Sequence, residues 1–338
     1  MNLKILIFTH KFFPDIGGLE TNAEILAKSF IKAGHQVRLV TWSQASAPSE
    51  FSFKVIRNPS FIQLLFVHKW ADVVFENNPC LRMSWLNIFF NRPAVVALNT
   101  WVQRMNGQMA IQDHLKIFFL KRASTVIAVS NAVRKKSWPL AVVINNPYND
   151  VLFRIIPDIN KTIDFVFLGR LVSDKGANLA VEAMKYFPDR RLTIIGDGIE
   201  LSTLKNLVAH LNLTTRVHFA GSLTGNDLAQ CLNMHKYILI PSVWEEPFGT
   251  VVLEGMACGC LPIASNGGGL PDAVGKAGIL FNRGDLNSLV NEINKITSNP
   301  AYELQLRQNA VDHLQAHRPQ ILAQQYLSIL KNAVSLVN

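Results

Sequence analysis

The sequence has few of the features that mark secreted, zinc-binding or membrane-spanning proteins. Its four cysteines are Cys80, Cys231, Cys258 and Cys260, and they show no paired CxxC spacing. We therefore expect neither a disulfide framework nor a zinc site, and a reducing cytoplasm is the natural setting. The opening apolar stretch is short and ends at residues 9–11, so it predicts a first strand and not a signal peptide. No apolar run approaches the roughly 20 residues that a spanning helix needs.

Motifs of several common ligand chemistries are also missing. No GxGxxG follows a predicted strand, so a dinucleotide cofactor is not indicated. No Asp-x-Asp pair appears, which leaves a metal-clamped diphosphate without obvious ligands. The net charge of +9 would suit nucleic acid, but helix-turn-helix and base-stacking motifs are absent. We expect no metal, no cofactor and no nucleic-acid partner.

Positive charge is concentrated in the first half of the chain. Residues 1–150 contain 17 Lys and Arg against 8 Asp and Glu, whereas residues 151–338 contain 16 of each kind. This asymmetry predicts that an anionic partner, such as a membrane surface or a phosphorylated acceptor, meets the first half. The alternative is a basic surface that only keeps the protein soluble.

Apolar segments of strand length alternate with helical segments along the chain. At 338 residues the chain exceeds one ordinary core, which predicts two domains of about 150 to 190 residues. The first half opens as strand, helix over residues 19–33, and strand, and a second series of strands begins with DFVFLGR and ends with GILFN. The fold class is therefore α/β, with two doubly wound Rossmann-like domains facing each other across a cleft.

A break in the pattern separates the two series. The motif NNP at residues 145–147 and the polar stretch that follows place the first domain at 1–150 and the second at 151–318. The final stretch, about 319–338, is predicted to be a helix that completes the first domain.

A Gly-Gly pair lies between the first strand and the first helix. In FPDIGGLE, Gly17 and Gly18 allow a ligand to approach the backbone closely, and free amides at the helix start favour an anion. Such a turn also occurs without any ligand, so the signal is weak by itself.

Two cations follow the first strand of the second series. Gly169 and Arg170 end that strand in GRLVSDKG, and Lys175 comes just before a helix start. An Arg fork and a compact Lys charge at the carboxyl edge of a sheet can neutralise a diphosphate without a metal.

Two carboxylates, Glu246 and Glu254, are separated by seven residues in WEEPFGTVVLEGMACG. Glu246 lies in a loop after a buried strand, and Glu254 lies about one turn into the next helix. Strand-to-helix junctions line the ligand crevice of open α/β sheets, and carboxylates there can accept hydrogen bonds from sugar hydroxyls. The backbone at the helix start would add contacts to the ligand through Phe248, Gly249 and Thr250.

Together, the segments PFGTVVLEGMACG, GRLVSDKG, PDIGG and IIGDG resemble family-4 retaining glycosyltransferases of the GT-B fold. The likeness implies a first domain for the acceptor and a second domain for a nucleotide-sugar donor. It further implies that Arg170 and Lys175 face the donor diphosphate, Glu254 the ribose and Glu246 the transferred sugar. Further donor contacts are implied at the remaining positions of these motifs and of HFAGSL, namely Gly17, Gly18, Gly169, Ser222, Leu223, Phe248, Gly249 and Thr250.

The acceptor side departs from the family pattern. Many members carry a His after the strands that match ADVVFE and AVVAL, whereas this chain has two Asn residues after the first and Asn99, Thr100 and Trp101 after the second. Asn99, Trp101 and His114 are therefore the acceptor-side candidates, although a lone His in a helix is usually structural. The aromatic and basic segments over residues 81–90 and 114–122 are expected to be helices that either pack on the sheet or lie on an anionic membrane surface.

The expected function is transfer of a hexose-type sugar, with retention and without a metal, from a nucleotide-diphosphate sugar to the hydroxyl of a saccharide or lipid-linked acceptor. UDP is the first expectation for the nucleotide, and GDP or ADP are alternatives. A cytoplasmic location is expected, with peripheral attachment to the inner face of the cell membrane as a variant of it. Two other functions stay open: a nucleotide-sugar epimerase of similar fold, and a catalytically silent relative that binds a nucleotide sugar.

Overall fold

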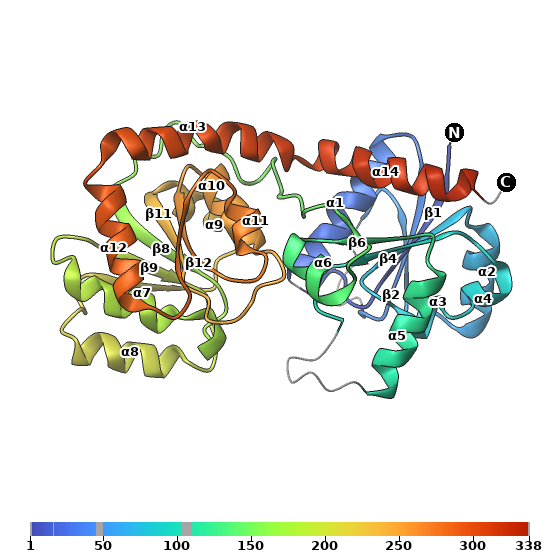
Figure 1. Cartoon of the computed structure of the whole chain (residues 1–338), viewed down its shortest axis with the longest axis horizontal. Coiled ribbons are helices and arrows are strands. Elements are labelled where there is room, and N and C mark those ends of the chain that lie inside the picture. The colour runs from blue at the N-terminus through green and yellow to red at the C-terminus, as the bar shows by residue number, and fades with distance from the viewer. Residues whose placement is uncertain (1, 16, 45–49, 103–109, 337–338) are drawn as a thin grey trace. The chain divides into compact units, whose positions relative to one another are not determined.

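The computed structural model describes residues 2–15, 17–44, 50–102 and 110–336. The chain divides into two compact units, one formed by Met1–Pro147 with Pro319–Asn338 and the other by Tyr148–Arg318 (Figure 1). Each unit contains one parallel sheet with helices on its faces.

The first unit is built on a seven-stranded sheet with the order β3-β2-β1-β4-β5-β6-β7. All neighbouring strands in it are parallel, and the order reverses direction between β1 and β4, as in doubly wound folds. The strands are β1 (Lys4–Thr9), β2 (Gln36–Thr41), β3 (Lys54–Arg57), β4 (Val73–Asn77), β5 (Ala94–Leu98), β6 (Thr125–Ala128) and β7 (Val142–Val143). The helices are α1 (Gly18–Lys32), α2 (Phe61–Trp70), α3 (Leu81–Ser84), α4 (Asn87–Phe90), α5 (Ile111–Arg122), α6 (Asn131–Ser137) and α14 (Pro319–Ser335).

Alternate side chains of this sheet enter different cores, because successive residues of a strand point to opposite faces. Ile5 and Ile7 of β1 pack with α1 and α14, where Phe30 and Tyr326 are fully buried. Leu6 lies on the opposite face and packs with α2 and α3. The last helix of the chain therefore belongs to the core of the first unit, beside α1.

The second unit is built on a six-stranded parallel sheet with the order β10-β9-β8-β11-β12-β13. The strands are β8 (Ile163–Leu168), β9 (Leu192–Ile195), β10 (Val217–Gly221), β11 (His235–Ile240), β12 (Leu261–Asn266) and β13 (Ile279–Asn282). The helices are α7 (Ala177–Ala183), α8 (Leu201–His210), α9 (Gly225–Asn233), α10 (Thr250–Ala257), α11 (Leu270–Val274), α12 (Leu286–Thr297) and α13 (Pro300–Ala316), with short 3-10 helices η1 (Ser173–Lys175) and η2 (Met184–Tyr186). The doubly wound order predicted from the sequence is thus confirmed for both sheets.

One helical prediction needs correction. The segment over residues 81–90 is not one amphipathic helix but two single turns, α3 and α4. The second turn ends because Asn91 takes a left-handed conformation with φ of 46°, and the Asn87 side chain bonds the carbonyl of Arg92 at 2.8 Å. Within the described residues, no helix is both long and apolar enough to cross a membrane.

Candidate active site

The candidate site lies where the second sheet reverses its winding direction. β8 lies between β9 and β11. The chain continues outward from β8 to β9, whereas from β11 it continues outward on the other side, so the strand order reverses between β8 and β11. Ligands of open α/β sheets bind at the carboxyl ends of strands at such a point. The segments that carry Arg170, Lys175 and Glu246 leave the sheet here.

The structure brings Lys175 and Glu246 together as an ion pair, although 71 positions separate them. The Glu246 side chain is 12% exposed and that of Lys175 is 20% exposed. Ser242 donates its hydroxyl to the same Glu246 oxygen at 3.0 Å. The pair is thus held in a partly desolvated position, where an ion pair is stronger than one at the surface.

Lys175 is fixed by the close approach of two backbone segments. The carbonyl oxygen of Asp174 accepts hydrogen bonds from the amides of Val243 at 3.0 Å and Trp244 at 3.1 Å. The next residue, Gly176, has φ of +67°, and a Cβ there would lie 2.0 Å from the carbonyl oxygen of Pro241. A side chain at this position would force the cation away from Glu246.

Arg170 adds an unpaired cation to this edge. Its side chain is exposed, and it forms no hydrogen bond or ion pair with any residue that the structure describes. A guanidinium in this state can bind an incoming anion without first breaking an internal pair.

The loop that carries Glu246 rests on a glycine triplet, which sequence reasoning missed. The amide of Gly269 donates to the carbonyl of Glu246 at 2.6 Å. Gly268 has φ of +58°, and a Cβ there would lie 2.3 Å from that carbonyl oxygen. Three glycines directly after LPIASN were the available signal, because such a run permits close packing of two backbones.

The start of α10 presents unpaired amides. Gly249 is the N-cap and provides no side-chain cap, and the backbone amides of Phe248, Gly249 and Thr250 donate to no described residue. The Phe248 side chain is buried and stacks on His317 with ring centroids 6.0 Å apart, which anchors the turn. Free amides at a helix N-terminus favour an anion.

Glu254 lies half-buried inside α10, and no hydrogen bond or ion pair of its carboxyl to another described residue is found. Burial raises its pKa to about 7, because the ionised form loses water and gains no donor in return. The carboxyl is therefore able to accept hydrogen bonds that the protein itself does not supply.

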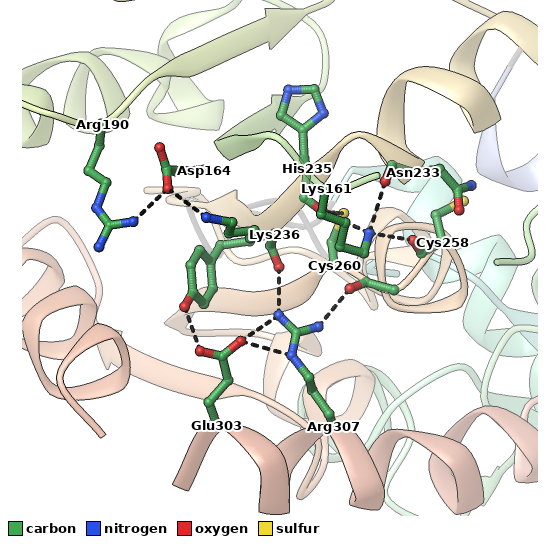
Figure 2. Close-up of polar contacts among 12 residues, drawn as sticks. Lys161, Asp164, Arg190, Asn233, His235, Lys236, Cys258, Cys260, Glu303 and Arg307 are labelled. Atoms are coloured by element: carbon green, nitrogen blue, oxygen red, sulfur yellow. Dashed lines mark hydrogen bonds and ion pairs between the residues drawn. The ribbon is translucent and has the colours of Figure 1, made fainter. Parts of the chain in front are cut away.

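The opposite end of α10 is held by two cations at the amino edge of the same sheet (Figure 2). The Lys161 ammonium donates to the carbonyls of Asn233 at 3.2 Å, His235 at 2.8 Å and Cys258 at 2.8 Å. Arg307 of α13 donates to the carbonyl of Gly259 at 2.7 Å. Cations at a helix C-terminus stabilise its unpaired carbonyls, so these two side chains fix the helix that carries Glu254.

The remaining predicted donor contacts of this unit also follow strands. Gly169 follows β8, and its amide donates to the carbonyl of Ile195 at 3.1 Å. Ser222 and Leu223 follow β10, which is separated from β8 by β9. Ser222 is exposed and Leu223 is half-buried. The positions of all three at the carboxyl edge agree with a ligand that extends along it.

In the first unit, three amide side chains meet at the carboxyl edge of the sheet. Asn99 donates to the side-chain oxygen of Asn77 at 2.8 Å, and Asn22 of α1 contacts both oxygens at 3.4 Å. All three are buried, and the Asn22 oxygen has no partner among the described residues. Gly17 and Gly18 begin the helix that carries Asn22. These hydrogen bonds satisfy the Asn99 amide and allow this polar side chain to be buried.

The other two acceptor-side candidates are Trp101 and His114. Trp101 is half-buried, and the Lys136 ammonium lies 5.3 Å from the centre of its ring. His114 is exposed on α5, and its side chain has no hydrogen bond to a described residue. No contact within the described part of the chain joins His114 to Asn99.

A small cavity of about 50 Å³ lies elsewhere in the first unit, between α4, α5 and the sheet. Glu76, Arg92 and Arg122 are among its lining residues, and burial raises the pKa of Glu76 to about 6. None of the predicted site residues lines it. Its volume is also far below what a nucleotide sugar requires.

Part of the chain matches a known protein family. Residues 151–313, which lie within the second unit, match the family described as glycosyl transferases group 1. The match includes Arg170, Lys175, Glu246 and Glu254.

Two curated relatives extend the likeness beyond that segment. An uncharacterized glycosyltransferase of Methanocaldococcus jannaschii is 25% identical over 324 residues, which span 80% of this chain and 83% of the relative. One subunit of phosphatidylinositol N-acetylglucosaminyltransferase from Arabidopsis thaliana is 23% identical over 335 residues, with 88% of this chain and 74% of the relative covered.

Among solved structures, Anabaena HepE in complex with UDP and glucose aligns with a TM-score of 0.81 at 21% identity, over 98% of this chain and 100% of HepE. At that identity the likeness establishes the fold. The chain has the GT-B fold, as the sequence motifs predicted.

Proposed function

We propose that this chain, whose residues 151–313 match the group 1 glycosyl transferases, is a retaining glycosyltransferase that works without a metal. It would move a hexose-type sugar from a nucleotide-diphosphate sugar to a saccharide or lipid-linked acceptor hydroxyl. The observation that carries the proposal is the pairing of Lys175 with Glu246 at the winding reversal of the second sheet, together with the unpaired Arg170 that follows β8.

Charge develops on the leaving diphosphate when the bond to the sugar breaks. Arg170, Lys175 and the free amides at the start of α10 converge on this edge and would stabilise that charge. Groups placed in advance around a developing charge are usually the largest single contribution to catalysis. They would also replace the charge neutralisation that a metal provides in other transferases.

The two carboxylates would take different hydroxyl groups of the donor. Glu254 has no internal donor and would accept from the ribose hydroxyls, while Glu246 would accept from the transferred sugar. Because Lys175 already neutralises Glu246, donor binding would move the ammonium toward phosphate and leave the carboxylate to the sugar. Reaction on the front face of the donor would retain configuration, so Glu246 is not assigned as a nucleophile.

The partners follow from these assignments. HepE was solved with UDP and glucose, which supports UDP as the nucleotide, with GDP or ADP as alternatives. The second unit would bind the donor and the first the acceptor, with Gly17 and Gly18 at the donor phosphates, and with Asn99, Trp101 and His114 as acceptor-side candidates. We further propose no cofactor, a cytoplasmic location and an anionic membrane surface as a partner of the first unit.

The decisive experiment combines donor binding with turnover. A thermal-shift panel of UDP-, GDP- and ADP-sugars should show one preferred nucleotide, since a ligand at 100 times its Kd stabilises a protein by about 2.7 kcal/mol. Release of the nucleoside diphosphate should then depend on an acceptor from a library of saccharides and lipid-linked saccharides.

Three other outcomes separate the alternatives. Conversion of a nucleotide sugar without any acceptor would indicate an epimerase. Donor binding without turnover would indicate a silent relative, and the absence of any shift would contradict the donor site itself.

A further inference from the structure

Three neighbouring helical segments of the first unit expose large apolar side chains. These nine residues, which we call the aromatic face, are Phe61, Ile62, Phe66, Trp85, Ile88, Phe89, Ile111, Leu115 and Phe118. Phe89 is 74% exposed and Phe66 is 67% exposed, so these rings meet solvent and do not pack on the sheet. A single exposed apolar residue needs no explanation, but a group of nine marks an interaction site.

The aromatic face is continuous across its helices. The rings of Phe61 on α2 and Trp85 lie 6.3 Å apart, and Trp85 lies 6.1 Å from Phe89 on α4. Ile88 of α4 and Arg122 of α5 line the same small cavity, which joins the third helix to the other two. The members from α2 to α4 therefore form one patch, and Phe118 of α5 borders it, because the Arg122 guanidinium lies 5.9 Å from the centre of the Phe118 ring.

The charges around this patch have one sign. Lys69, Arg82, Lys121 and Arg122 are exposed, and none of them forms an ion pair with a described residue. The acidic residues of the same stretch are not exposed, since Glu76 and Asp113 are buried and Asp72 is half-buried.

From this combination we infer that the aromatic face docks on an anionic lipid bilayer, which deepens the membrane partner named in the proposed function. Aromatic and aliphatic side chains enter the boundary between headgroups and acyl chains, and Lys and Arg bind lipid phosphates. A second copy of this chain is a poorer occupant, because a symmetric contact would bring two sets of unpaired cations together.

The opposite face of the same sheet provides a matched control. Lys32 of α1 and Lys331 of α14 are exposed there, and Ile321 is the one large apolar side chain of these two helices that is exposed. The double variants Lys121→Gln/Arg122→Gln and Lys32→Gln/Lys331→Gln remove the same charge from the two faces. Because all four side chains are exposed, both variants should fold, which circular dichroism would verify.

Vesicle sedimentation tests the inference. Wild type should bind vesicles that contain phosphatidylglycerol and should not bind pure phosphatidylcholine vesicles. The Lys121→Gln/Arg122→Gln variant should bind at least tenfold more weakly, as should Phe66→Ser/Phe89→Ser/Phe118→Ser, while Lys32→Gln/Lys331→Gln should stay within twofold of wild type.

Equal losses in both charge variants would overturn the inference, because binding would then follow net charge and not this face. Absence of vesicle binding, or a dimer in sedimentation velocity that the triple Phe variant abolishes, would overturn it as well. A Lys175→Ala variant should bind vesicles normally, so failure of the donor site and failure of the docking face give different results.

Discussion

Both ends of the second sheet carry charged side chains, but these side chains differ in how many internal hydrogen-bond partners they have. At the amino end, Lys161 bonds three carbonyls, and Arg307 bonds Glu303 as well as the carbonyls of Lys236 and Gly259 (Figure 2). At the carboxyl end, Arg170 and Glu254 have no partner among the described residues. Polar groups that satisfy one another hold structure together, whereas groups left without partners are available to a ligand.

Helix α10 connects these two ends. Its C-terminus is held by the saturated cations, and its N-terminus presents free amides and the Glu254 carboxyl. Rigid support behind a binding group improves its placement. The comparison therefore predicts that substitutions at the amino end change stability, while substitutions at the carboxyl end change turnover.

The largest effect is expected for Lys175→Ala. The variant should lose about 100- to 1000-fold in turnover, because one charge that stabilises the leaving diphosphate is removed. Removing Lys175 also leaves the mostly buried Glu246 carboxylate without its cation, so the melting temperature should fall as well and turnover must be compared per folded molecule. Steady-state release of the nucleoside diphosphate measures the loss.

Lys185→Ala is the matched control for that variant, because Lys185 is an exposed lysine of the same unit. It should turn over at the wild-type rate. Turnover of Lys175→Ala within threefold of wild type would remove Lys175 from the site.

Lys161→Met should have the next largest effect, and on stability. Methionine keeps the length of the side chain but leaves three carbonyls without their donor, which should cost about 2 to 3 kcal/mol. Urea unfolding should show a lower midpoint with an unchanged slope. Turnover per folded molecule should stay within about threefold of wild type.

Lys205→Met provides the comparison, because Lys205 is exposed on α8. Its unfolding free energy should be close to that of wild type. A Lys161→Met protein as stable as this control would show that the amino-end contacts are incidental.

Sequence reasoning predicted the positions of the candidate residues in the sheet better than it predicted their contacts with one another. Strand periodicity and the breaks after each strand placed Arg170, Lys175 and Glu246 at one sheet edge. The pairing of Lys175 with Glu246 and Ser242 was not predictable, because it depends on how two loops 71 positions apart pack.

The contacts of the first unit were predicted less completely for a related reason. The Asn residues after β4 and β5 were visible in the sequence, but the contact of Asn77 and Asn99 with Asn22 depends on how α1 packs on the sheet. The break between α3 and α4 lies at Trp85 and Leu86, and it was not predicted because neither residue type interrupts a helix in the way that Gly or Pro does.

The smallest effect concerns the pH dependence of donor binding. Without a ligand, the pKa of Glu254 is raised to about 7, so part of the population is protonated at neutral pH. Ribose hydroxyls donate to the ionised form and should lower this pKa in the complex. The affinity for the preferred nucleotide sugar should therefore rise about tenfold between pH 5.5 and 7.5 and then level off.

The Glu254→Gln variant separates this titration from every other group. Its amide oxygen can still accept a hydrogen bond but the side chain cannot ionise, so the affinity should be nearly independent of pH over the same range.

In the unliganded protein the pH dependence of stability has the opposite sign: the raised pKa of Glu254 favours folding at low pH, and that contribution to the unfolding free energy is lost as the pH rises through about 7. Wild type should thus lose stability without donor, relative to Glu254→Gln, over the interval in which it gains affinity. Calorimetric titration and thermal unfolding across this range measure the two trends, and parallel curves for the two proteins would contradict the assignment of Glu254 as the unsatisfied acceptor of the site.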